Sequence, residues 1–144
     1  MGRLAEGGAT HDTEPDALQL AAATLMVEAA RLDGDFDASE QRLIRRVLAE
    51  HFGLSADEVE TLIKAADARQ QDAVEISRMT MAIKDGYPPE KRTEIIEMLW
   101  EVVLADGELH PYEANLLRRI GGLIYVSDRE NGEARQRVIA RRNG

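Results

Sequence analysis

Two short acidic segments hold the residues best able to do chemistry. The first runs from Asp33 to Arg46 and reads DGDFDASEQRLIRR, and the second runs from Asp106 to Arg119 and reads DGELHPYEANLLRR. The segments lie 73 residues apart, and Asp-Gly, Glu, Leu and Arg-Arg stand at the same offsets in both. Self-similarity at a fixed spacing indicates a duplicated supersecondary unit.

The acidic side chains of these segments favour a hard divalent cation. Oxygen-only ligands suit Ca²⁺ or Mg²⁺, and Asp33, Asp35 and Asp37 stand two residues apart in the first copy. Two carboxylates ~6 Å apart repel by roughly 2–3 kcal/mol at an effective dielectric constant of about 20, so the fold must solvate them, hydrogen-bond them or bind a cation. The candidate metal ligands are Asp33, Asp35, Glu40, Asp106, Glu108 and Glu113.

Helix capping is the competing interpretation of the same residues. A carboxylate at the start of a helix accepts backbone N–H bonds and stabilises the positive end of the helix dipole. Asp37 with Glu40 matches a capping box, and Glu113 stands at the corresponding position of the second copy. We expect His110 to cap the following helix, because a usable metal site needs several convergent ligands. Both interpretations stay open at the level of sequence.

The elements that position these segments are predicted to be helices. Apolar residues recur at helical spacing, and no stretch alternates with period two over a useful length, so we expect no strand. The helices beginning at Asp16 and Pro89 are apolar around most of their circumference, which places them at the centre. The helix beginning at Asp72 is expected to be shorter, to run through Ile76, Met79, Met81 and Ile83 and to end before a break at residues 85–89.

These elements predict an all-α fold, a seven-helix single domain. Its two similar three-helix halves, residues 16–69 and 89–143, are joined by a linker helix and should superpose. Residues 1–15 are glycine-rich, polar and aperiodic, which predicts a disordered leader before a helical domain at residues 16–144.

Composition narrows the class of function. The net charge of −9 repels phosphate backbones and excludes nucleic acid as a general partner. The chain contains no cysteine, so disulfides, thiolate metal sites and a cysteine nucleophile are excluded. No apolar run approaches the ~20 residues that cross a bilayer, and the start of the chain lacks a signal-peptide pattern. We therefore expect a cytoplasmic protein without membrane insertion.

These motifs resemble the tellurite-resistance TerB family and the related N-terminal region of membrane-anchored DnaJ-type co-chaperones. The resemblance covers about residues 16–142 and rests on a helix ending in A-x-x-D-G, with an acidic residue six positions after the glycine. It implies an all-helical domain of two similar halves, linked to tellurite and chemical stress, with a metal-linked and protein-interaction role and no established catalysis. Carried over by position, its acidic residues are Asp33, Glu40, Asp106 and Glu113, followed by Asp35 and Glu108.

We therefore expect a non-enzymatic helical module whose acidic surface binds a divalent cation or another protein with a basic surface. Two alternatives stay open. One is an enzyme that uses a carboxylate-bridged metal pair, and the other is a purely structural scaffold that forms a homodimer. The enzyme needs convergent polar ligands in a concave pocket, and no histidine of this chain stands in the Glu-x-x-His pattern of a di-iron bundle.

Overall fold

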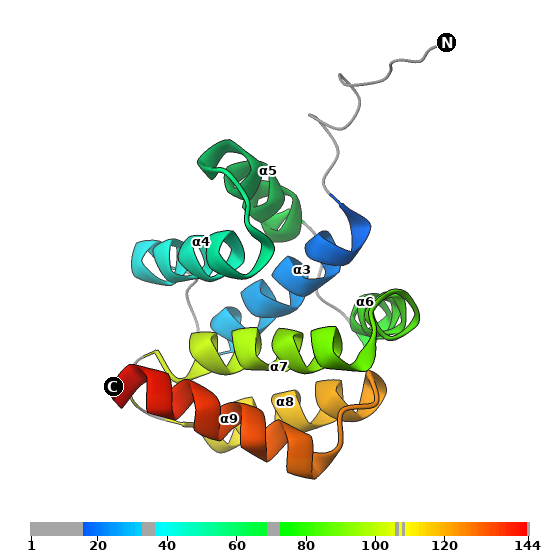
Figure 1. Ribbon diagram of the computed structural model, residues 1–144. Helices are drawn as coiled ribbons and strands as arrows, with labels where there is room; N and C mark the ends of the chain where they lie inside the picture. Colours follow the sequence, from blue (N-terminus) through cyan, green and yellow to red (C-terminus); the bar gives the residue numbers. More distant parts are fainter. Residues whose placement is uncertain (1–15, 33–36, 69–72, 106, 108, 144) are drawn as a thin grey trace.

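The computed structural model describes residues 16–32, 37–68, 73–105, 107 and 109–143, and within them the chain forms seven α-helices and no strand. The helices, shown in Figure 1, are α3 (Ala17–Arg31), α4 (Ala38–Phe52), α5 (Ala56–Asp67), α6 (Ala73–Gly86), α7 (Pro89–Val103), α8 (Pro111–Leu123) and α9 (Asp128–Asn143). The predicted all-α, seven-helix single domain is confirmed. The expected leader, residues 1–15, lies outside the described residues.

Two helices, α3 and α7, form the centre of the molecule. Helix α3 packs against α4, α5, α6 and α7, and α7 packs against α3, α4, α8 and α9. Figure 1 shows α7 running between α4 on one side and α8 and α9 on the other. Every residue of α3 from Ala21 to Ala30 is buried except Glu28, which confirms the predicted central position of this helix. None of the helices in the described ranges is long and apolar enough to cross a membrane.

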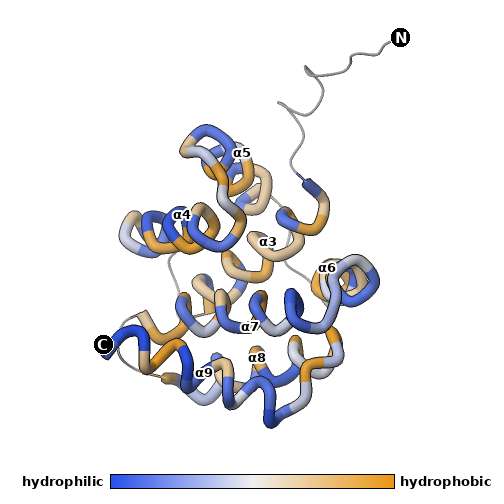
Figure 2. The backbone as a smooth tube through the Cα atoms, viewed as in Figure 1, coloured by the Kyte–Doolittle hydropathy of each residue, from blue (hydrophilic) through white to orange (hydrophobic). Residues whose placement is uncertain are grey.

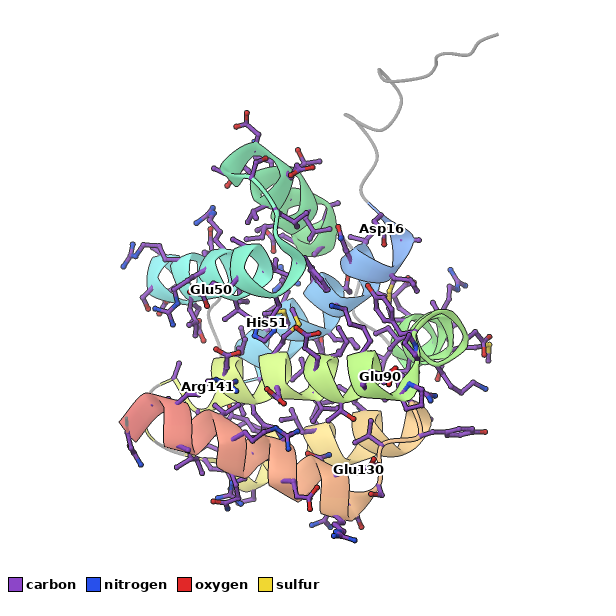
Figure 3. The ribbon with its side chains drawn as sticks, viewed as in Figure 1. Asp16, Glu50, His51, Glu90, Glu130 and Arg141 are labelled. Carbon is purple, nitrogen blue, oxygen red and sulfur yellow. The ribbon has the colours of Figure 1, made fainter. Side chains whose placement is uncertain are left out.

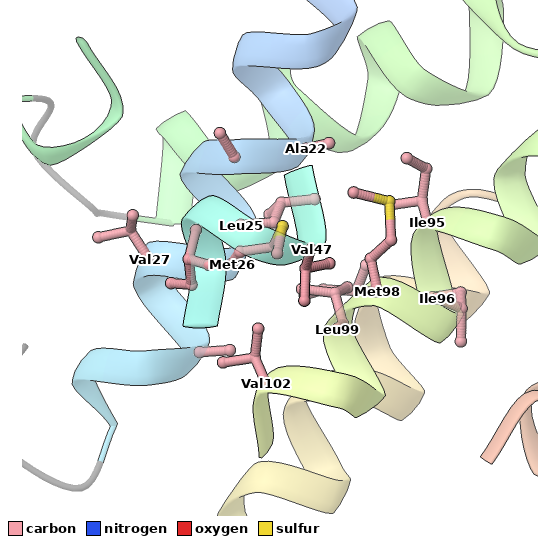
Figure 4. Close-up of a cluster of buried hydrophobic side chains, with 14 of the residues drawn as sticks. Ala22, Leu25, Met26, Val27, Val47, Ile95, Ile96, Met98, Leu99 and Val102 are labelled. Atoms are coloured by element: carbon pink, nitrogen blue, oxygen red, sulfur yellow. The ribbon is translucent and has the colours of Figure 1, made fainter. Parts of the chain in front are cut away.

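The core is built mainly from aliphatic side chains of the two central helices. Figure 4 shows Leu25 and Met26 of α3 gathered with Val47 of α4 and with Met98 and Leu99 of α7, and all five side chains are fully buried. Figure 2 shows apolar colours along most of α3, whereas α7 alternates between apolar and hydrophilic stretches. Helix α7 therefore has an apolar side in the core and a polar side that meets charged neighbours.

The two halves use the same pairwise packing. In the first half α3, α4 and α5 all contact one another, and in the second half α7, α8 and α9 do the same. Helix α6 joins the halves and packs against α3 and α8. This arrangement agrees with the predicted duplication around a linker helix.

The duplication is also visible in the backbone between the second and third helices of each half. Gly53 has φ +65° and Tyr125, its equivalent after a one-residue slip in the repeat, has φ +63°. Two residues later, Ser55 and Ser127 each accept a hydrogen bond from the backbone N–H of the glutamate three positions on, at 3.2 and 3.1 Å. Tyr125 thus adopts a left-handed conformation that glycine adopts more easily.

Helix α6 differs from its prediction. It spans 14 residues, fewer than the 15 of α3 and of α4 but more than the 12 of α5, and it continues through Gly86 where the sequence predicted a break. A Cβ atom at Gly86 would lie 2.7 Å from Leu18 Cδ1, so the glycine allows α6 to pack closely against the start of α3. That packing offsets the ~1 kcal/mol by which glycine weakens a helix relative to alanine. Among the four apolar residues predicted in this helix, Met81 is 58% exposed, whereas the other three are buried.

Candidate functional site

A cavity of about 450 Å³ lies where the two halves meet. The ends of α3 and α7 supply its apolar wall, and the starts of α4 and α8 supply three carboxylates. The described lining residues are Ala29, Ala30, Asp37, Ser39, Glu40, Leu43, Val102, Val103, Ala105 and Glu113. Glu40 and Glu113, which occupy equivalent positions of the repeat, therefore face one shared space.

In the first half, the start of α4 is closed by a reciprocal pair of hydrogen bonds. The backbone N–H of Glu40 donates to Asp37 Oδ1 at 2.9 Å, and the backbone N–H of Asp37 donates to Glu40 Oε1 at 3.1 Å. Ser39 Oγ donates a further bond to Asp37 Oδ1 at 2.9 Å. The bond from the Glu40 N–H, followed by that from Ser39, lowers the pKa of Asp37 below its ordinary value. The capping box predicted from sequence is confirmed here.

In the second half, the carboxylate at the equivalent position is buried. Glu113 is only 4% exposed, and its Oε1 accepts a hydrogen bond from the backbone N–H of His110 at 3.2 Å. His110 stands at the N-cap position of α8, and its ring stacks on that of Tyr112 with 5.3 Å between centroids. Burying a carboxylate is costly unless hydrogen bonds or an opposite charge compensate it. Glu113 is the most deeply buried of the three carboxylates that line the cavity.

The structure brings together the two predicted ligands that it describes. Glu40 and Glu113 share the cavity, whereas Asp33, Asp35, Asp106 and Glu108 lie outside the described residues. Within the described part of the chain, no group of three or more His, Cys, Asp or Glu side chains is placed to hold a metal ion.

Comparisons with known proteins agree with this architecture. The family model for tellurite resistance protein TerB matches residues 19–136. The chain belongs to the TerB family. Its fold is also similar to the crystal structure of a protein of unknown function from Porphyromonas gingivalis, with a TM-score of 0.61, 21% identity, and coverage of 96% of this chain and 97% of that one. Among curated proteins, none matches the chain.

A second polar cluster of this TerB-family domain was not found by sequence reasoning. His51 of α4 lies between two glutamates of α7, with Nδ1 2.7 Å from Glu94 Oε2 and Nε2 2.8 Å from Glu101 Oε2. Figure 3 shows His51 between α4 and α7. The hydrogen bond with Glu101 is the main cause that raises the pKa of His51, while burial opposes it. The cluster thus links the first half to the second.

The polar side of α7 extends this cluster to α9. Glu97 lies 2.7 Å from Arg137 and 3.1 Å from Arg141, and Arg141 also lies 3.5 Å from Glu101. Lys91 lies 2.9 Å from Glu94. Burial acts to raise the pKa of the Glu94 carboxyl, but the hydrogen bonds with Lys91 and His51 together outweigh burial, so this pKa lies below its ordinary value. The signal in the sequence is the three, then four, residue spacing of these glutamates, which places them on one helix face. Each carboxylate has a basic partner, and the contacts of the cluster connect α7 to α4 and to α9.

Proposed function

We propose that this TerB-family chain is a non-enzymatic helical module that binds a divalent cation, Ca²⁺ or Mg²⁺, in the cavity between its two halves. The observation that carries the proposal is the buried carboxylate of Glu113, which shares the cavity with its repeat equivalent Glu40. A cation between carboxylates compensates both their repulsion and the loss of water. All-oxygen ligands favour hard cations over transition metals.

The ligands of the proposed site come from both halves. Glu40 contributes from the start of α4 and Glu113 from the start of α8. The remaining predicted ligands, which precede these glutamates in the two repeated segments, are Asp33, Asp35, Asp106 and Glu108. Because the halves share the cation, its binding should stabilise the domain as a whole.

A binding role is supported by the chemistry of the cavity wall. Its described polar side chains are three carboxylates and one serine, and the rest of the wall is aliphatic. Such a wall can hold a cation, whereas hydrolytic or redox chemistry also needs a positioned base, nucleophile or second metal. We further propose that the module serves a chemical stress response such as tellurite resistance, on the support of the family description.

A basic side chain from a partner protein is the second candidate for this cavity. The chain has a net charge of −9, which attracts basic surfaces as well as metal ions. A lysine ammonium group can insert between carboxylates in place of a metal ion. The two candidates differ in one respect that experiment can separate, because free metal ions stabilise the isolated domain only in the first case.

Thermal unfolding with and without divalent ions tests the proposal. Wild-type protein should gain about 2.7 kcal/mol at a hundredfold excess of the cation over its Kd, beyond the effect of matched ionic strength. Glu113→Gln should lose most of this gain, because the amide retains a hydrogen-bond acceptor but not the charge. Glu130→Gln is the matched control, since the exposed Glu130 stands at the same capping position of α9 and is not among the residues that line the cavity.

Two results would decide against cation binding. The first is a melting temperature that ignores millimolar Ca²⁺, Mg²⁺, Mn²⁺ and Zn²⁺ once ionic strength is matched. The second is an equal loss of response in Glu113→Gln and Glu130→Gln, which would trace the effect to general surface charge. Stoichiometric binding of a short lysine-rich peptide, with no metal response, would favour the basic partner.

A further inference from the structure

The two halves differ at one pair of equivalent charged positions. Arg45 of α4 corresponds to Arg118 of α8, and after the one-residue slip Glu60 of α5 corresponds to Gly132 of α9. In the first half, Arg45 Nε donates a hydrogen bond to Glu60 Oε1 at 2.9 Å. The second half keeps the arginine and lacks the glutamate. Within the described residues, Arg118 forms no ion pair.

A pocket of about 190 Å³ lies where the missing glutamate would stand. It lies among α7, α8 and α9, and its wall includes Trp100, Arg118, Asp128, Asn131, Gly132 and Arg135. A Cβ atom at Gly132 would meet no neighbouring atom within 4 Å. The glycine is therefore not required by close packing, and its effect is to leave this space open beside Arg118.

The pocket is positively charged on an acidic protein. Two guanidinium groups, of Arg118 and Arg135, stand against the single carboxylate of Asp128. The Arg135 guanidinium lies 5.6 Å from the centre of the Trp100 ring, a cation–π contact that holds it in place. Arg135 Nε is buried and has no hydrogen-bond partner among the described residues. A buried donor of this kind is stabilised when an acceptor reaches it.

Hydrogen bonds within the chain hold the buried side chains of the pocket, Trp100 and Asn131, in place. Trp100 Nε1 donates to Asn131 Oδ1 at 2.7 Å, and Asn131 Nδ2 donates to the carbonyl oxygen of Leu117 at 3.1 Å. A Cβ atom at Gly121 would lie 2.7 Å from Asn131 Nδ2, so a larger residue there would displace the amide. These two bonds fix the position of the Asn131 amide, and the two arginines supply the charged donors for a ligand.

We propose that this pocket binds the carboxylate side chain of a glutamate or aspartate from a partner polypeptide. In the first half, the carboxylate of Glu60 bonds to Arg45, which is the repeat equivalent of Arg118. The proposed ligand takes the corresponding place beside Arg118. Arginine presents a planar fork of donors that matches a carboxylate. The carboxylate pocket and the cation cavity have no residue in common among the described lining residues, so the carboxylate pocket stands independently of cation binding.

Trp100 provides a direct readout because it is the only tryptophan of the chain and lines the pocket. The probe is the capped peptide acetyl-Ala-Glu-Ala-amide, titrated at constant ionic strength while Trp100 fluorescence and its indole N–H resonance are followed. We expect a saturable change that the matched peptide acetyl-Ala-Gln-Ala-amide does not give. Arg118→Ala should weaken binding by about tenfold or more, since one charge-assisted contact is lost.

Two further variants separate binding from folding. Gly132→Glu should abolish peptide binding by restoring the ion pair within the chain, and Gly132→Ala should bind like wild type. Both variants should fold, because the position is open and glycine is the weaker helix former. Arg45→Ala, the equivalent change in the first half, should leave the titration unchanged.

Three outcomes would overturn the proposal. One is the same response to the glutamate and glutamine peptides. Another is unchanged binding in both Arg118→Ala and Gly132→Glu. The third is binding of free acetate as tight as that of the peptide, which would make the pocket a site for small anions and remove the argument for a polypeptide ligand.

Discussion

Glu40 and Glu113 line the same cavity although 73 residues separate them in the chain. Each stands three residues after the N-cap of its helix, and each accepts a hydrogen bond from the backbone N–H of that N-cap residue. The duplication therefore does more than repeat a helical unit. It brings the acidic starts of α4 and α8 to one shared space between the halves.

Deleting a leucine side chain in either central helix should strongly destabilise the domain. Leu25 of α3 and Leu99 of α7 are fully buried in the shared core. Leu25→Ala and Leu99→Ala should each lower the free energy of unfolding by about 2–5 kcal/mol, measured by urea denaturation. Leu123→Ala is the control, because that side chain is 41% exposed and its loss should change stability by less than about 0.5 kcal/mol. Equal effects at the three positions would contradict the assigned core.

The left-handed residue between α8 and α9 offers a stabilising substitution. Tyr125 has φ +63° and is 72% exposed, with Lys84 5.1 Å above its ring. Tyr125→Gly should raise stability by roughly 0.5–1 kcal/mol, because glycine adopts this conformation without strain. Gly53→Ala, the reverse change at the equivalent position, should lower stability by about 1 kcal/mol. A destabilised Tyr125→Gly variant would show that the contact with Lys84 outweighs the backbone strain.

The link between the halves at His51 should depend on pH. Its pKa is raised in the folded state, first by the hydrogen bond with Glu101 and then by Glu94. A raised folded-state pKa means that protonation stabilises the fold fully below about pH 6.5 and that this stabilisation is lost as the pH rises through the folded-state pKa. The difference in unfolding free energy between wild type and His51→Gln should therefore be larger at pH 6 than at pH 9.

Urea denaturation of both proteins across that range measures this difference. The other charged groups of the cluster are Lys91 and Arg141, and the pKa of Glu94 is lowered, so that carboxylate stays ionised above pH 6. A difference that does not change with pH, or one that grows toward pH 9, would contradict the assigned role of His51.

The sequence predicts local features well because their signals are local. The capping box of Asp37 and Glu40 depends on a three-residue spacing, and the serine caps of α5 and α9 follow the same rule. The shared cavity of Glu40 and Glu113 is a tertiary relationship, and the repeat alone does not say which faces of the two halves meet. The contacts of His51 were missed for the same reason, since Glu94 and Glu101 lie more than 40 residues away.

Helix α6 differs from its prediction because of packing contacts that the sequence pattern does not reveal. Gly86 normally indicates the end of a helix, yet here it remains helical because the start of α3 lies against it. Met81 is exposed although its neighbours Met79 and Ile83 are buried. The side of a helix that faces the core depends on the partner helix, and for a linker helix this partner is set by the whole fold.

The most direct test of the account is the stoichiometry of cation binding by isothermal titration calorimetry. A single cavity shared by the halves predicts one transition with one Ca²⁺ or Mg²⁺ per chain. It also predicts that Glu40→Gln and Glu113→Gln each weaken that same transition by at least about tenfold, because each removes one charged ligand. Two independent transitions, each weakened by only one of the two variants, would contradict the shared site, and the absence of any transition would contradict cation binding itself.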